Sequence, residues 1–182
     1  MRYKNNKKII IIKTIIIFLS LFLFSFVYKK IPNFLTSLFF PVNESLFEHL
    51  RMIYNAEIIV SIVIYIVLKR KNIKINNFFS SLLLSTIFNI ILFFLIYFPM
   101  YRNFGSNLII TMILYFITLC ISQYLFYLIS IKKHNDFYNK LSLIIIPLIW
   151  IILIYFTYNP PKLEFFFDPI DEIYGIPSKI NK

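Results

Sequence analysis

The sequence predicts an all-α integral membrane bundle of five transmembrane helices, with the N-terminus in the cytoplasm and the C-terminus outside. The first observation is composition: 59% of the 182 residues are hydrophobic and 15% are charged, whereas a soluble domain has about 45–50% and about 25%. So short a chain cannot hide that much apolar surface in a core. The second observation is that five apolar stretches approach the roughly 20 helical residues that cross a hydrocarbon layer of about 30 Å.

The predicted helices form one transmembrane domain over residues 1–158. They span about residues 9–27, 44–68, 78–100, 108–131 and 141–158. Lys13 interrupts the first run and can extend its amine to the inner head groups. No small-x-small cleavage site follows this run, so we expect a retained helix, the alternative being a cleaved signal peptide.

Local features of the sequence also support the other four predicted helices. The second starts with Asn43 as N-cap and Glu44 in the first turn, where the helix dipole favours an anion. The third and fourth runs contain no charged residue. The fifth ends at Asn159-Pro160-Pro161, because proline cannot continue a helix.

Orientation follows from Lys and Arg, which are enriched in cytoplasmic loops. Twelve of these residues fall at predicted cytoplasmic positions and seven at outer positions. Six of the eight acidic residues fall at predicted outer positions. The enrichment of Lys and Arg in cytoplasmic loops does not explain this asymmetry, because Asp and Glu contribute little to topology. Residues 159–182 are then an extracytoplasmic tail.

The net charge of +11 would suggest nucleic acid as the partner of a soluble protein. Here the basic residues lie in short loops beside apolar runs, where they set topology and attract anionic lipid. We therefore expect membrane lipids and a membrane protein as partners, and no nucleic acid. The bias towards Ile, Asn, Lys, Phe and Tyr is typical of an AT-rich bacterial genome and favours a bacterial plasma membrane. The lone Cys120 excludes a disulfide framework within the monomer.

The segment Pro41–Arg51 is the least generic part of the chain. At about 100° per residue, its polar side chains share a narrow helical stripe, formed by Glu44, Glu48, Arg51 and Asn55. His49 lies about a quarter-turn from Glu48. In a structural interpretation Glu44 caps the helix and Glu48 pairs with Arg51. In a functional one, Glu44, Glu48 and His49 act as general acid and base or bind a divalent metal ion.

The tail is the obvious source of further ligands, because the spacing of Glu48 and His49 does not match the metalloprotease pattern. The predicted role of residues 159–182 is a cap that packs on the outer face, with a tight turn at Gly175. In the alternative, tail carboxylates join Glu48 and His49. The candidate catalytic residues are Glu44, Glu48, His49 and Asp168, and the candidate metal ligands are Glu48, His49, Asp168 and Asp171, with Glu172 as a further tail carboxylate that could contribute.

Glu57 is the third informative residue. Eleven residues separate it from the inner end of its helix at Leu68, or about 16 Å, which places it near the bilayer centre. With Asn55 it belongs to the predicted intramembrane polar set, and we expect it to face the bundle interior near Asn89 or Gln123. It is either a protonated side chain making one interhelical hydrogen bond, worth about 0.6 kcal/mol, or a functional group.

The chain resembles a family of small bacterial multi-pass membrane proteins, the domain of unknown function 6512. The resemblance is carried by Pro41-Val42-Asn43-Glu44-Ser45, Glu48-His49-Leu50-Arg51, Asp168-Pro169 and Tyr174-Gly175-Ile176. The family pattern has a large residue where Phe47 stands and Lys where Arg51 stands. The resemblance covers essentially the whole chain and implies a membrane location with no established activity.

Three functions are compatible with these residues. The first is a non-enzymatic accessory or small-molecule-binding membrane protein whose polar motif is structural. The second is a membrane-embedded metal-dependent hydrolase or transferase that uses Glu44, Glu48 and His49. The third is a small transporter or transport subunit that uses Glu57.

Overall fold

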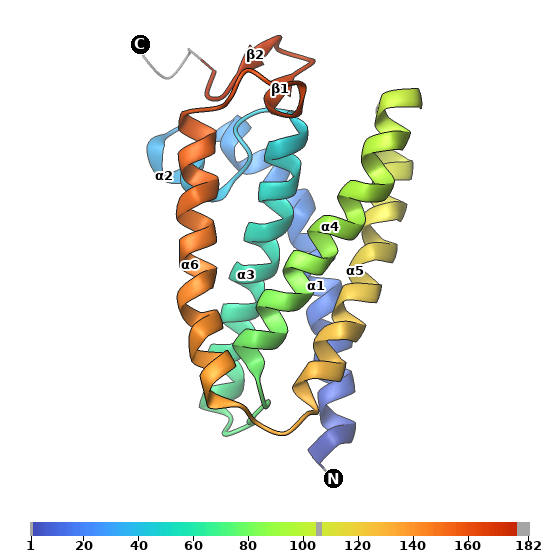
Figure 1. Ribbon diagram of the computed structural model, residues 1–182, viewed down its shortest axis with the longest axis vertical. Coiled ribbons are helices and arrows are strands. Elements are labelled where there is room, and N and C mark those ends of the chain that lie inside the picture. Colours follow the sequence, from blue (N-terminus) through green and yellow to red (C-terminus); the bar gives the residue numbers. More distant parts are fainter. Residues whose placement is uncertain (1, 105–106, 178–182) are drawn as a thin grey trace.

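The computed structural model describes residues 2–104 and 107–177, and the side chains of 7–102 and 107–177. The fold is helical, as predicted, and five of its helices are long and apolar enough to cross a membrane. The described helices are α1 (Arg2–Lys30), α2 (Phe34–Phe39), α3 (Leu46–Arg70), α4 (Phe78–Phe104), α5 (Leu108–Ser130) and α6 (Asp136–Tyr158). The described N- and C-terminal parts of the chain lie at opposite ends of the bundle (Figure 1).

The bundle is held together by two hydrophobic clusters, one in each half. α1 packs against α3 and α5, and α4 packs against α3, α5 and α6. We call the end that carries α2 and residues 159–177 the tail end. The cluster in the tail-end half includes Ile17, Leu50, Phe93 and Leu119. The cluster in the other half includes Ile10, Leu82, Phe126 and Ile146. Large apolar side chains on α1, α4, α5 and α6 face outward, which is the surface that lipid would cover.

The start of α3 differs from the prediction. Ser45, not Asn43, is the N-cap: its backbone is extended and its hydroxyl accepts a hydrogen bond from the Glu48 N–H. Asn43 instead stabilises the turn before the helix, since its Oδ1 accepts from the Ser45 N–H at 2.9 Å. Glu44 therefore precedes the helix and is not part of its first turn.

The sequence did not predict α2. Asn33 and Thr36 begin this helix by capping each other's backbone N–H groups. α2 lies beside the tail-end turns of α6 and not above them (Figure 1), and the Phe39 ring stacks on Trp150 of α6 at 5.3 Å. The segment that carries α2 thus re-enters the bundle.

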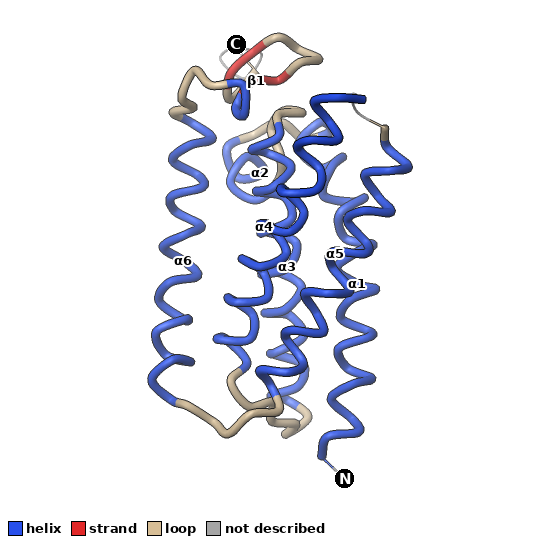
Figure 2. Tube along the Cα trace, turned by 45° about the vertical axis from the view of Figure 1, so that its right-hand side comes forward, coloured by secondary structure: helices blue, strands red, loops and turns tan. Residues whose placement is uncertain are grey.

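The tail covers one end of the bundle (Figure 2) and lies over the N-terminal end of α3 (Figure 1). A short 3-10 helix, Glu164–Phe166, leads into a two-stranded antiparallel hairpin of β1 (Phe167–Asp168) and β2 (Ile173–Tyr174). Phe166 packs against Phe47, with ring centroids 4.7 Å apart. Gly175 has φ +69°, and a Cβ there would lie 3.0 Å from Pro160 and the Thr157 carbonyl, so the turn requires glycine. Residues 178–182 of the predicted tail lie outside the described residues.

Candidate functional site

The pair formed by Glu48 and Arg51 is buried, and its hydrogen bonds are complete. Each residue is 1% exposed. The Arg51 guanidinium donates to Glu48 Oε2 from Nε at 2.9 Å and from Nη2 at 2.6 Å. Its other N–H groups donate to carbonyls at the end of α2, those of Ser37, Leu38 and Phe40. All five donors of a guanidinium are therefore in use.

The remaining oxygen of Glu48 connects the pair to α6. Glu48 Oε1 accepts from the Thr157 hydroxyl at 2.8 Å, and Oε2 also accepts from the Val42 N–H at 3.1 Å. Asn55 donates to the Phe39 carbonyl at 2.8 Å, so it belongs here and not with Glu57 in the predicted intramembrane set. We call Glu48, Arg51, Asn55 and Thr157 the tail-end cluster. It satisfies the carbonyls that end α2 and joins the re-entrant segment to α3 and α6.

Asp168 also has a structural position. It is fully buried, and its Oδ2 accepts from the Glu44 N–H at 2.9 Å. Its Oδ1 accepts from the N–H groups of Ile170 and Asp171 at 2.7 and 3.2 Å. Asn43 makes a second link from the turn before α3 to the tail, donating to the Gly175 carbonyl at 2.8 Å. Asp168 thus fixes the hairpin turn and holds the tail on the start of α3.

The predicted catalytic and metal-binding residues are not gathered at one point. Glu48 faces Arg51 and α6, whereas His49 faces Glu44. Asp171 and Glu172 are exposed on the hairpin. Within the part of the chain that the structure describes, three or more His, Cys, Asp or Glu side chains do not come together in a group that could hold a metal ion.

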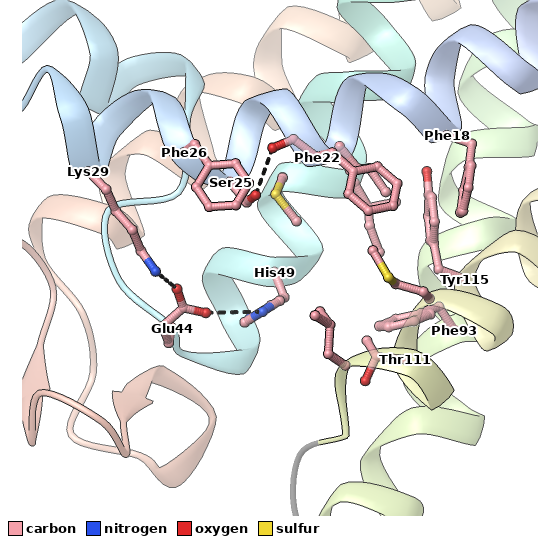
Figure 3. Close-up of a pocket in the computed structure, with 15 residues that line it drawn as sticks. Phe18, Phe22, Ser25, Phe26, Lys29, Glu44, His49, Phe93, Thr111 and Tyr115 are labelled. Carbon is pink, nitrogen blue, oxygen red and sulfur yellow. Dashed lines mark hydrogen bonds and ion pairs between the residues drawn. The ribbon is translucent and has the colours of Figure 1, made fainter.

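Glu44 and His49 instead stand at the mouth of a pocket of about 300 Å³, which we call the side pocket (Figure 3). Its walls come from α1, α3, α4 and α5 and are mostly apolar, with Phe18, Phe22, Ile53, Phe93 and Met112 among the lining residues. At the mouth, Lys29 pairs with Glu44 Oε1, and His49 Nε2 lies 3.5 Å from Glu44 Oε2. The pocket therefore has an apolar body and an ionic mouth.

Tyr115 is a buried polar residue in the lining of the side pocket. Tyr115 lines it beside Phe93, and both residues are nearly fully buried. The Tyr115 hydroxyl has no hydrogen-bond partner among the described residues. The hydroxyl is thus a buried polar atom close to the side pocket.

A second buried charged group lies at mid-helix. Glu57 is fully buried. Its Oε1 accepts from Asn89 of α4 at 2.5 Å, and its Oε2 accepts from Thr86 at 3.0 Å and from Gln123 of α5 at 3.2 Å. The structure thus places Glu57 in the bundle interior, beside both Asn89 and Gln123.

The position of Lys13 differs from the prediction. We expected its amine to extend to the head groups, but the side chain is 1% exposed. Its ammonium lies 3.4 Å from the centroid of the Phe126 ring and interacts electrostatically with Glu57. Snorkelling is favourable only when no buried partner competes, and here α3 supplies a carboxyl group. We call Lys13, Glu57, Thr86, Asn89 and Gln123 the core polar cluster.

Several atoms in and around the core polar cluster have no hydrogen-bond partner among the residues described. They are Lys13 Nζ, Asn89 Oδ1, Gln123 Oε1, and the hydroxyl oxygens of Ser61, Ser81 and Tyr115. An unsatisfied buried polar group costs about 1–3 kcal/mol, and a charged one costs more. So many in one bundle therefore require an explanation.

The family model of DUF6512, a family of unknown function, matches residues 1–176 of the chain. The chain belongs to DUF6512. This confirms the resemblance seen in the Pro41–Arg51 motif. The DUF6512 match runs from α1 through β2, so it includes the tail-end cluster, the side pocket and the core polar cluster. No curated protein and no solved structure matches the chain.

Proposed function

We propose that this chain is a bacterial plasma-membrane protein that binds a small amphiphile in the side pocket. The N-terminus is cytoplasmic and the C-terminus external, so that the pocket opens in the outer half of the bilayer. The observation that carries the proposal is the combination of apolar walls with the ionic mouth of Lys29, Glu44 and His49. The protein is then a binding or accessory protein and not an enzyme.

The volume and the walls favour a ligand with an apolar body. About 300 Å³ lies at the lower end of the range for small-molecule sites, which are mostly apolar with a few fixed polar groups. The apolar part would lie among Phe18, Phe22 and Phe93.

The mouth favours a head group with both donors and acceptors. His49 Nδ1 lies 2.9 Å from the Ser45 carbonyl, and because a carbonyl only accepts, Nδ1 carries a proton. His49 Nε2 and Glu44 Oε2 lie 3.5 Å apart, so a polar head group can bridge the two. Lys29 retains donors for an acceptor on the ligand. An amine- or hydroxyl-bearing lipid head group meets both requirements.

Access from the lipid supports the same proposal. Phe22, Phe26 and Leu108 line the pocket, and they are 37%, 57% and 73% exposed on the surface of the bundle. Such a wall opens sideways, towards lipid. An amphiphile already dissolved in the bilayer could then enter without leaving it.

The test is photolabelling in lipid vesicles with an alkyne-tagged monoacylglycerol whose acyl chain carries a diazirine, because its head group bears hydroxyl groups. We expect label on the peptides that contain residues 18–29 and 108–115, and loss of that label in Thr111→Trp, which fills the pocket. Ile113→Trp is the matched control, because Ile113 is 57% exposed on the outside of the same helix. Equal labelling of all outward faces, unchanged by Thr111→Trp, would refute the proposal.

The metal-dependent enzyme has less support. Of its proposed residues, Glu48 and Asp168 are fully engaged in structural hydrogen bonds, and Glu44 and His49 remain as a pair. Two ligands do not make up the usual protein coordination of a catalytic zinc, which takes three.

A further inference from the structure

We propose that the core polar cluster is a proton-transfer site, and that the protein conducts protons between the side pocket and a second pocket in the other half of the bundle. The second pocket lies between α1 and α5, has a volume of about 540 Å³, and is lined by Ile10, Thr14, Cys120, Gln123 and Tyr127, among others. This inference does not depend on the amphiphile.

The two pockets meet opposite ends of one polar stripe on α5. Tyr115 lines the side pocket and Gln123 lines the second pocket. They lie eight residues apart, or about 12 Å along the helix. Thr118 and Ser122 lie between them and are fully buried on the same face. A row of hydroxyl and amide groups therefore runs through the interior from one pocket to the other.

Glu57 joins this row at its Gln123 end, where Gln123 donates to one of its carboxyl oxygens at 3.2 Å. Lys13 on α1 and Tyr115 on α5 are the titratable groups of the helices packed around Glu57, whereas α4 contributes the neutral Thr86 and Asn89. A carboxyl group in this position can hold a proton between the two pockets.

The unpartnered atoms indicate that something polar passes through the cluster. Lys13 Nζ supplies donors without acceptors, and the oxygens of Asn89 and Gln123 supply acceptors without donors. Each is at least nine-tenths buried. Water molecules would satisfy both kinds of atom at once, since each water donates and accepts. A chain of such waters through the cluster is the medium that proton transfer needs.

The charge of Lys13 favours protons over metal cations. A sodium or potassium ion at Glu57 would lie close to an ammonium group in an environment that screens charge poorly. A proton instead leaves a hydronium ion in one pocket, binds a Glu57 oxygen, and passes to water on the other side. The O–H bond broken is replaced by the one formed, and nothing is oxidised or reduced.

The experiment is proton flux into vesicles of phosphatidylethanolamine and phosphatidylglycerol with trapped pyranine, driven by a potassium gradient and valinomycin. We expect wild-type flux above that of protein-free vesicles, and flux at the protein-free rate in Glu57→Gln. Glu57→Asp, which keeps a carboxyl group, should restore part of it. Asp136→Asn is the control that removes the same charge, because Asp136 is an exposed carboxylate at the end of the bundle opposite the tail end.

Two results would overturn the proposal. One is wild-type flux equal to that of protein-free vesicles, and the other is wild-type flux retained by Glu57→Gln. A second measurement covers the case in which Glu57→Gln does not fold. Infrared difference spectra of the wild type should show a carboxylic acid band that changes with pH and shifts with deuterium exchange. A wild-type spectrum without such a band overturns the proposal without any variant.

Discussion

Helix α3 carries two buried acidic residues nine positions apart, Glu48 and Glu57. They differ in how completely the cationic side chain near each is hydrogen-bonded. Glu48 and its cationic partner Arg51 have hydrogen bonds for every N–H of the guanidinium and for both carboxylate oxygens. Glu57 has its own hydrogen bonds, but its cationic partner Lys13 has none within the described residues. Both pairs are removed from solvent, so burial alone does not distinguish them.

The difference shows which pair serves the fold. Removing charges from water is offset only when geometry is good and all remaining donors and acceptors are satisfied. The tail-end cluster meets that requirement and binds the carbonyls at the end of a re-entrant helix, a place where exposed backbone would not be tolerated in a membrane. The core polar cluster does not meet it. Its incomplete hydrogen bonding is what a site that exchanges protons with water would show.

The largest expected effect is that of Arg51→Met. It leaves Glu48 buried without its partner and uncaps three carbonyls, so the free energy of unfolding should fall by about 3–5 kcal/mol. Trp150 fluorescence during thermal unfolding in detergent is the measurement, because Trp150 stacks on Phe39 of α2. Arg102→Met, at an exposed arginine, is the control. Equal melting temperatures for the two variants would show that Arg51 is not structural.

Asn55→Leu should have the next largest effect. It removes the donor that satisfies the Phe39 carbonyl, and an unsatisfied buried acceptor costs about 1–3 kcal/mol. Val63→Leu on the exposed side of α3 is the comparison. We expect a lower melting temperature and an altered Trp150 emission for Asn55→Leu only. If both variants melt as the wild type does, the re-entrant segment does not depend on α3 for its end cap.

The sequence predicted those contacts in the two clusters that depend on the spacing within one helix, or on the rule that a polar residue of a membrane helix faces the interior. The i, i+3 spacing predicted the Glu48–Arg51 pair. A single strongly polar residue in an otherwise apolar helix must face the interior, which brought Glu57 together with Asn89 and Gln123. The five long helices follow from hydropathy in the same way.

The remainder depends on tertiary contacts that no single segment contains. The apolar run in segment 31–45 is too short to mark a membrane helix, and the short helix of this segment is stabilised by side chains of α3 and α6. His49 and Glu48 are adjacent in sequence, yet they face different neighbours. Lys13 did leave a signal, because Ser20 follows it at i+7 and so lies on the same helical face. That pattern indicates an inward polar face on α1.

Lys13→Met should act in the opposite direction to Arg51→Met. It replaces a buried ammonium that lacks hydrogen-bond partners, so we expect the free energy of unfolding to rise by about 1 kcal/mol, while proton flux falls to the protein-free rate. Lys8→Met, at an exposed position, controls for the lost charge. A Lys13→Met protein that is markedly less stable than wild type would make Lys13–Glu57 a structural pair and remove the contrast between the two clusters.

Lys29→Met should have the smallest effect on stability. It therefore tests ligand binding in the side pocket separately from the stability that the two clusters determine. The Lys29 side chain is 57% exposed, and exposed ion pairs contribute about 0–1 kcal/mol, further reduced by salt. We therefore expect an unchanged melting temperature but weaker photolabelling of residues 18–29, because the mouth of the pocket loses a donor for the head group. A fall in stability with labelling intact would instead assign Lys29 and Glu44 to the scaffold. The side pocket would then be left without an ionic mouth.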